Sequence, residues 1–177
     1  VKSEDVPKKL IGENITFAAE TPKGTRYFNG FVREVVTGDR AEKSQGYELE
    51  VVPWLWFLTQ TSDCRIFQKK TIPQIIEDVF KDLGFQDFDT SGIKGDHKEW
   101  DYCVQYRETD FNFVSRLMEQ EGIYYFFEHK DKVHKLVLTD SSSGYVDCLE
   151  KDGFYPTSTG SDDFAAQITS WEHRYEF

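Results

Sequence analysis

The chain is 177 residues long, enough for one domain or two small ones, and 38% of its residues are hydrophobic and 16% aromatic. This many large apolar side chains excludes a disordered polymer, and no apolar run approaches the roughly 18 residues of a membrane span. The net charge of −11 argues against nucleic-acid binding, because phosphate backbones repel an acidic surface.

The N-terminal residues and the cysteines give expectations about processing and compartment. The N-terminus lacks the basic head and apolar core of a secretory signal, and Met118 is the sole methionine, so we expect a processed chain or an excised segment. Cys64, Cys103 and Cys148 are odd in number and widely spaced, which favours a reducing compartment over a disulfide framework. The four histidines form no metal-binding pair, so we expect neither a metal nor a cofactor.

The first sixty residues have the pattern of an antiparallel meander, as in a small barrel. Alternating β-formers predict strands over residues 13–19, 25–36 and 46–52, with Gly30 at a bulge or bend. A polar hairpin loop is expected over 37–45. The aromatic segment after Pro53 is included in the meander, with the proline marking an edge or kink.

A helix is predicted next, beginning after Thr71. Thr71 and Gln74 have the spacing of a capping box, and Pro73 falls in the first turn, where it loses no hydrogen bond. Gly84 is expected to end this helix. A polar loop is then predicted over 86–99.

A strand over residues 100–106 and a second helix are predicted to follow. Thr109 or Asp110 would cap this helix, and Gly122 would end it. Further along the chain we expect a hairpin of residues 123–128 and 133–139, a linker, and the beginning of a new strand at residue 165.

Catalytic motifs are weak in this sequence. Glu119 and Glu121 are two residues apart on a helix, so they diverge and do not form the facing carboxylate pair of a glycosidase. Ser115 lacks the strand–turn–helix setting of a nucleophile elbow. Residues 92–95 lack a preceding strand and the Lys-Ser/Thr of a phosphate loop. We therefore expect no catalytic residue.

Aromatic residues suggest two alternatives. The run Tyr124–Phe127, together with Trp54, Trp56 and Trp100, could form a platform for sugar rings. A continuous apolar strand is more often buried on both faces, and aromatic residues are also enriched at protein interfaces. Core or subunit interface is therefore the favoured interpretation, and it indicates an assembly protein.

One stretch is specific. Residues 102–129, with the run YRETDFNFVSRLMEQEGIYYFF, closely resemble the signature of VgrG, the spike protein of bacterial type VI secretion, and of contractile-phage tail hubs. Other matching segments occur in the expected order, among them Arg26–Gly30, Pro53–Leu58 and Cys64–Gln68. The resemblance extends from about Leu10 to Tyr175. Its signature residues are Arg107, Glu108, Thr109, Asp110, Phe111, Phe113, Arg116, Glu119, Gly122 and Tyr124.

The resemblance implies an α+β fold, mainly antiparallel, in which barrel-like hub domains carry an inserted α/β segment with two helices. The predicted divisions are a first barrel at 1–60, the insertion at 61–140, a linker at 141–164 and the beginning of a second barrel at 165–177. The signature is interpreted as a structural helix–turn–strand unit. From the residues, Arg107 and Glu108 are expected to pair.

The implied function is structural and non-enzymatic: a hub segment of a trimeric spike that caps a hexameric Hcp-type tube and helps deliver effectors. Effector and baseplate proteins are further implied partners. Assembly in the bacterial cytoplasm would precede secretion or injection. A contractile-phage tail hub is a close alternative, and a carbohydrate-binding or cell-wall-hydrolysing module is an alternative of another class.

Overall fold

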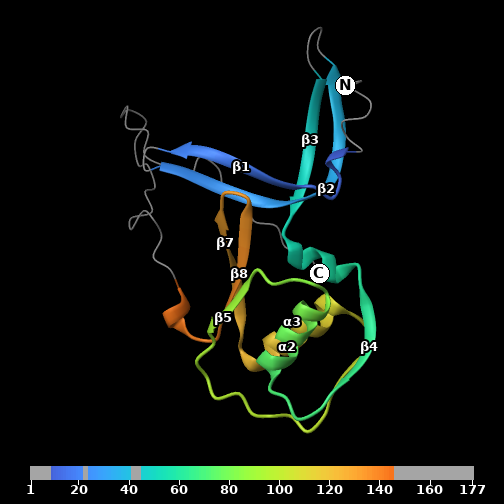
Figure 1. Ribbon diagram of the computed structural model, residues 1–177, viewed down its shortest axis with the longest axis vertical. Helices are drawn as coiled ribbons and strands as arrows, with labels where there is room; N and C mark the ends of the chain where they lie inside the picture. Colours follow the sequence, from blue (N-terminus) through green and yellow to red (C-terminus); the bar gives the residue numbers. More distant parts are fainter. Residues whose placement is uncertain (1–8, 22–23, 41–44, 146–177) are drawn as a thin grey trace, which may run out of the picture. The chain divides into compact units, whose positions relative to one another are not determined.

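A computed structural model describes residues 9–21, 24–40 and 45–145 of the chain. The chain divides into a compact unit of residues 1–144 and a second unit of residues 145–177. The predicted strand from residue 165 and nearly all of the predicted linker lie outside the described residues. Within the described part, helices and mainly antiparallel strands form an α+β fold, which confirms the predicted class (Figure 1).

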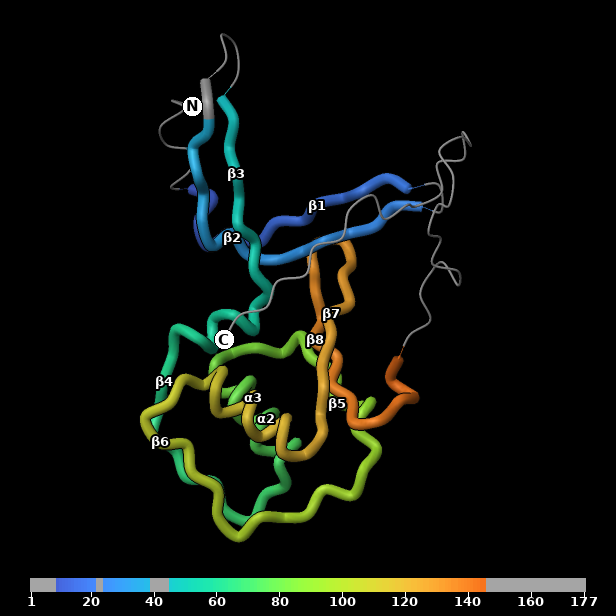
Figure 2. The backbone as a smooth tube through the Cα atoms, turned by 180° about the vertical axis from the view of Figure 1, so that it is seen from behind, coloured from blue at the N-terminus to red at the C-terminus, as the bar shows by residue number. Residues whose placement is uncertain are grey.

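The first sheet is the predicted antiparallel meander. Its strands are β1 (Asn14–Thr21), β2 (Gly24–Arg40) and β3 (Gln45–Val52), in the spatial order β1-β2-β3. The first half of β2 pairs with β1 and the second half with β3, and β2 changes direction between them (Figures 1 and 2).

Gly30 is not itself a bulge, because it pairs in register with Ile15 and the nearest irregular register in β2 falls between Val32 and Glu34. It does directly precede Phe31, where β2 passes from pairing with β1 to pairing with β3. The glycine is needed for another reason: a Cβ atom there would lie 2.7 Å from the Val52 carbonyl oxygen, so only glycine lets β3 approach this closely. The hairpin loop is also shorter than expected, because β2 remains paired with β3 as far as Arg40.

The aromatic segment after Pro53 is a 3-10 helix, η2 (Trp54–Thr59), and not a part of the meander. Pro53, with φ −71°, ends the ladder of β3 because it has no N–H to donate. Trp54, Leu55 and Leu58 are buried on one side of η2. Helical spacing of these residues directs them into the core, which alternation along a strand would not do.

The next layer combines an antiparallel β4–β6 ribbon with two helices. Thr71 caps α2 as predicted: its hydroxyl accepts a hydrogen bond from the Gln74 N–H at 3.4 Å, and the Gln74 amide oxygen accepts one from the Thr71 N–H at 2.9 Å. The apolar face of α2 is fully buried, as the sequence periodicity predicts. The elements are β4 (Ser62–Phe67), α2 (Ile72–Asp82), β6 (Cys103–Thr109) and α3 (Asp110–Glu121).

A three-stranded sheet of order β5-β8-β7 completes the described unit. The predicted hairpin is confirmed as an antiparallel pair of β7 and β8, whereas β5 was predicted as loop. β5 pairs in parallel with β8, for example Phe88 with Leu136, and a strand whose only partner lies this far along the chain leaves no hairpin pattern in its own sequence. The strands are β5 (Phe88–Gly92), β7 (Tyr124–Lys130) and β8 (Val133–Thr139).

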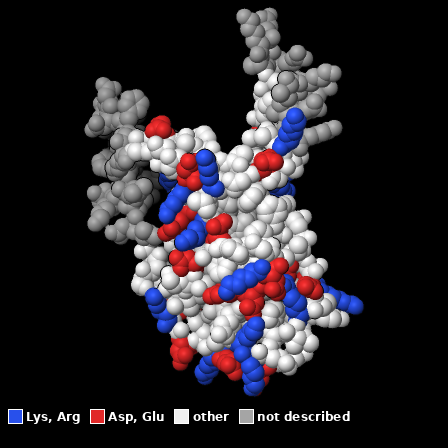
Figure 3. All heavy atoms as spheres, in the orientation of Figure 1, with Lys and Arg blue, Asp and Glu red and all other residues white. Residues whose placement is uncertain are grey.

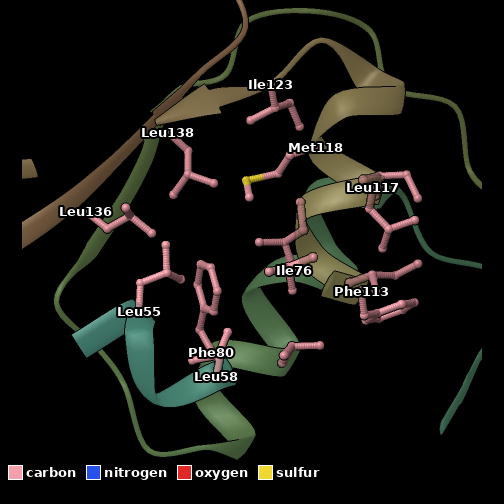
Figure 4. Packing of buried hydrophobic residues seen from close by; sticks show 14 of the residues in the cluster. Leu55, Leu58, Ile76, Phe80, Phe113, Leu117, Met118, Ile123, Leu136 and Leu138 are labelled. Atoms are coloured by element: carbon pink, nitrogen blue, oxygen red, sulfur yellow. The ribbon is translucent and has the colours of Figure 1, made fainter. Parts of the chain in front are cut away.

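The core lies where η2, α2, α3 and β8 meet (Figure 4). Leu55, Phe80, Leu117 and Leu136 are 2% exposed or less, and their side chains point toward one another from these four elements. Each buried side chain of this size stabilises the fold by about 1.5–3 kcal/mol relative to exposure. The same core includes the buried Cys103.

A buried hydrogen-bond network joins the first sheet to β8 and η2. The Trp54 N–H donates to His134 Nε2 at 2.8 Å, so the imidazole proton is on Nδ1, which donates to the Asn29 side-chain oxygen at 2.7 Å. Burial holds the pKa of His134 below its ordinary value, with a smaller contribution from His129. A neutral histidine therefore satisfies both neighbours.

Candidate functional site

The signature residues form one continuous helix–turn–strand unit made of the end of β6, α3 and the beginning of β7. Thr109, and not Asp110, caps α3: its hydroxyl accepts a hydrogen bond from the Asn112 N–H at 3.1 Å. Phe113 is fully buried and its ring stacks on Phe67, with centroids 5.7 Å apart. The half-buried Phe111 packs against the same core.

Asp110 is instead the centre of a buried polar network. Its carboxylate is 1% exposed, forms an ion pair with Arg65, and accepts a hydrogen bond from the Gln105 side-chain nitrogen at 2.8 Å. Arg65 Nε also donates to the Gln105 side-chain oxygen at 2.9 Å. The network locks β4 and β6 onto the first turn of α3. Sequence analysis missed it, because Arg65 and Asp110 are 45 positions apart and share no motif.

Arg116 pairs with Glu108, so the expected pairing of Arg107 with Glu108 is wrong. The Arg116 guanidinium donates to the Glu108 carboxylate at 2.7 and 2.9 Å and to the Val104 carbonyl at 2.8 Å. The hydrogen bond from Arg116 holds the pKa of Glu108 below its ordinary value. The arginine also lies over the Phe113 ring, 4.9 Å from its centroid. It thereby clamps α3 to β6.

Gly122 makes the turn from α3 into β7. Its φ of +69° is left-handed, its N–H donates to the Glu119 carbonyl, and the Ile123 N–H donates to the Met118 carbonyl at 2.8 Å. This pair of bonds is a Schellman motif, which satisfies the last carbonyls of the helix. The Glu119 side chain is exposed, as expected for a solvated helix face. Tyr124, the first residue of β7, donates its hydroxyl to the Ser141 carbonyl at 2.7 Å.

A titratable cluster lies at the opposite end of α3 from the Asp110 network. His97 Nδ1 lies 2.7 Å from a Glu121 carboxylate oxygen, and His97 Nε2 lies 2.9 Å from Asp140. Asp140 also accepts hydrogen bonds from the N–H groups of Lys94 and Gly95, at 2.9 and 2.7 Å. Glu121 therefore has a structural partner, His97. Residues 92–95 do follow a strand, contrary to expectation, and they surround the Asp140 carboxylate of the chain itself.

The charges in this cluster determine its titration. Burial disfavours the charged imidazolium, but the bonds to Glu121 and Asp140 outweigh it, so the pKa of His97 lies above its ordinary value. Burial likewise opposes the Asp140 carboxylate, yet the two backbone N–H groups and His97 lower its pKa to about 2. No signal in the sequence links these residues, because they come from a loop, a helix end and a strand end.

Trp54 does not belong to an exposed platform for sugar rings. Trp54 is 2% exposed and its ring packs against Phe80 and Phe85 in the core. Most of β7 is half-buried and Tyr125 is 37% exposed, so the run from Tyr124 is not buried on both faces within a single chain. Its predicted place in a subunit interface stays a prediction.

Basic and acidic side chains are intermixed over the helix-containing part on the face shown in Figure 3. Within the described ranges, no group of three or more His, Cys, Asp or Glu side chains is arranged to hold a metal ion. No helix among the described residues is both long and apolar enough to cross a membrane. The described geometry of the signature residues is that of a packing unit held by two sets of polar contacts, the Asp110 network and the Arg116–Glu108 pair.

The chain matches the phage tail baseplate hub (GPD) family over residues 1–177, so it belongs to that family. It is also 49% identical to the type VI secretion system spike protein VgrG1c of Pseudomonas aeruginosa, over 85% of this chain and 21% of that protein. Its identity to VgrG1a of the same organism is 44%, over 86% of this chain and 24% of that protein. The resemblance to VgrG spikes and phage tail hubs is therefore confirmed.

A solved structure gives the same result. The chain resembles the Escherichia coli c3393 protein with a TM-score of 0.73 and 25% identity, over 79% of this chain and 39% of that one. That protein is described as a component of the type VI secretion system, similar in structure to bacteriophage T4 tail proteins gp27 and gp5. The chain spans about a quarter or less of the length of the two Pseudomonas relatives.

Proposed function

We propose that this chain is a hub segment of a VgrG-like spike, which in its full-length form is a homotrimer seated on a hexameric Hcp-type tube ring. The observation that carries the proposal is the complete signature unit, with its Thr109 cap, Arg116 clamp and Gly122 turn, in a chain that matches the hub family throughout. The unit packs α3 against β6 and the core, so its role is structural and not enzymatic.

Symmetry supports the trimer. Three chains can cover the end of a six-fold tube only if each chain offers two similar surfaces. The meander of β1, β2 and β3 would belong to the first such surface, and the segment from residue 165 would begin the second. The divisions at 1–60, 61–140, 141–164 and 165–177 stay part of this proposal. Effector and baseplate proteins are its further partners, and cytoplasmic assembly precedes secretion or injection.

The solution mass of the full open reading frame, measured by light scattering, tests the proposal. We expect a trimer that co-sediments with purified Hcp-type rings. A stable monomer, or a trimer that leaves the rings in the supernatant, contradicts the spike role. Glu119→Gln removes the exposed carboxylate of the two and should leave secretion intact; loss of a cell-wall activity in that variant would instead favour a hydrolase.

A contractile-phage tail hub is the second candidate, because the matching family is described as a phage tail baseplate hub. The two candidates predict different partners for the same trimer. Genes for a type VI sheath and tube beside the reading frame favour the spike, whereas phage head and packaging genes favour the tail hub.

A further inference from the structure

The outward face of the β4–β6 ribbon is apolar, although the other face of the ribbon packs on the core. Cys64 opposes Tyr106, and Ile66 opposes Val104, whereas the alternate residues Phe67 and Cys103 are buried. Ile66 is 60% exposed and Tyr106 is 64% exposed. We call Cys64, Ile66, Val104 and Tyr106 the ribbon face. Ile66 and Tyr106 are the large exposed side chains of this face, beside the smaller Cys64 and the half-buried Val104, and neighbouring exposed apolar side chains are typical of a protein interface.

Arg107 adjoins this face in an unusual backbone conformation. Its φ is +52°, and the register shifts there, since Asp63 pairs with Glu108 and Cys64 with Tyr106. Arg107 is therefore the extra residue of a bulge, at a left-handed position that glycine would occupy without strain. Strained backbone of this kind is found at functional sites, because the side chain it presents is worth more than the lost stability.

The Arg107 side chain is presented outward and lacks an acidic partner. Its guanidinium lies over the Tyr106 ring, 5.2 Å from the centroid, which extends the ribbon face by one cation. Glu108, its neighbour in sequence, is bound by Arg116. No ion pair joins Arg107 to any carboxylate of residues 9–21, 24–40 and 45–145. Tyr and Arg are the residue types that most often dominate binding energy at interfaces.

We propose that the ribbon face and Arg107 dock a segment of a different protein, one that offers apolar side chains to Ile66 and Tyr106 and a carboxylate to Arg107. Charge complementarity favours an acidic partner segment, since Arg107, which adjoins the ribbon face, is an exposed cation with no ion-pair partner among the described residues. A second copy that met the surface through the same face would bring two arginines together, which is unfavourable; a neighbouring copy that used a different face is the competing occupant, and the crosslinking test distinguishes it from a different protein. The proposal goes beyond trimerisation and tube capping.

The test places a photo-crosslinking benzoyl-phenylalanine at Tyr106 of the full-length protein, in the cells in which that protein works. Because Tyr106 is exposed, the substitution leaves the core intact. We expect one adduct with another protein, mapped by mass spectrometry to a segment that contains Asp or Glu. Arg107→Glu should lower the adduct about tenfold, since like charges repel at an interface. Reversing the partner's carboxylate to Lys should restore it.

Two controls separate recognition from general damage. Lys98→Glu makes the same charge change at an exposed residue between β5 and β6, outside the ribbon face, and should leave the adduct unchanged. The same crosslinker at Tyr125, on β7, should not capture this partner. Arg107→Gly relieves the left-handed backbone, so it should keep or raise the melting temperature and still lose the adduct.

Four outcomes overturn the proposal. These are an adduct only with another copy of the chain, no adduct at all, an adduct that Arg107→Glu leaves unchanged, and an Arg107→Gly variant that melts lower than the parent. The last result would assign Arg107 a structural role within the bulge. Restoration of the adduct by the paired charge reversal supports the proposal directly, because general damage cannot be repaired by a change in the partner.

Discussion

The turn at Gly122 offers a clean measurement, because only backbone strain opposes a side chain there. An ideal Cβ atom built on Gly122 has no neighbour within 4 Å, so Gly122→Ala creates no clash. The φ of +69° nevertheless forces alanine into the left-handed region. If this residue abandons that conformation, the Schellman bonds to Glu119 and Met118 are lost and β7 leaves α3 in a different direction.

The magnitude follows from the conformation. A non-glycine residue in the left-handed region costs about 1–2 kcal/mol. For a chain of this size, 1 kcal/mol shifts the melting temperature by about 2–4 °C, so Gly122→Ala should lower it by about 2–8 °C. Gly122→Val should lower it further, because a β-branched side chain tolerates positive φ even less. Gly122→Asn should cost less than Ala, because Asn visits this region readily.

The assay is thermal melting of the chain followed by circular dichroism, with two glycines as comparisons. Gly84 ends α2 with the same pair of bonds, φ +85° and no neighbour within 4 Å of a Cβ, so Gly84→Ala should give a similar loss. Gly38 lies in β2 without positive φ and has room for a Cβ, so Gly38→Ala should have little effect. Equal melting temperatures for Gly122→Val and the parent would refute the reasoning.

Three further perturbations test the core, the buried ion pair and the titratable cluster. Leu117→Ala should cost about 3–5 kcal/mol in chemical unfolding, because the fully buried side chain leaves a cavity. Asp110→Ala should cost about 3–5 kcal/mol, because Arg65 loses its buried partner. The pKa of His97 is higher in the folded than in the unfolded chain, so the protonated imidazolium stabilises the fold. This contribution to the free energy of unfolding is present below about pH 6.5 and is lost as the pH rises through the folded-state pKa. His97→Gln should therefore destabilise the protein more at about pH 5 than at about pH 9. Folding lowers the pKa of Asp140 from 3.8 to about 2, so the Asp140 carboxylate should contribute on the order of 2 kcal/mol to the free energy of unfolding above about pH 4. That contribution should be lost as the pH falls through about 2.

Matched control variants test whether each loss of stability has the stated cause. Leu117→Met keeps the volume and should cost under about 1.5 kcal/mol. Asp63→Ala removes an exposed carboxylate near Arg65 and should change stability by less than about 1 kcal/mol. A loss on Asp110→Ala no larger than that on Asp63→Ala would contradict the buried network. A His97→Gln effect that stays constant across pH would show that the imidazole is neutral in the fold.

Local patterns predicted the helices accurately, because each helix carries its own caps. Thr71 with Gln74 marks the beginning of α2, and Gly122 marks the end of α3, within a few residues of sequence. The hairpin of β7 and β8 is equally local. The choice between Thr109 and Asp110 as cap was left open by the sequence. The choice depends on which of the two side chains binds to the β4–β6 ribbon. Arg65 of β4 forms an ion pair with the Asp110 carboxylate, which leaves Thr109 as the cap.

The wrong expectations share a cause. β5 was predicted as loop because its only partner is a parallel strand far along the chain, and parallel pairing depends on contacts that no short window contains. The composition of the segment from Trp54 suits a strand and predicts a continued β meander, but burial of Leu55 and Leu58 in a shared core favours the helical spacing. Arg107 was paired with Glu108 by proximity in sequence, whereas the bulge turns them apart.

The sequence by itself determined the helices α2 and α3, the glycines that end them and the β7–β8 hairpin, and an ordered set of motifs determined the family and, with it, the fold class. These features depend on the order of residues within short windows, where capping, periodicity and turn geometry act. Only the tertiary structure decided which polar residues meet: Arg65 with Asp110, Glu108 with Arg116, and His97 with Glu121 and Asp140. Such pairs form because packing of the core brings distant segments together, and a charge left in the interior must then find a partner.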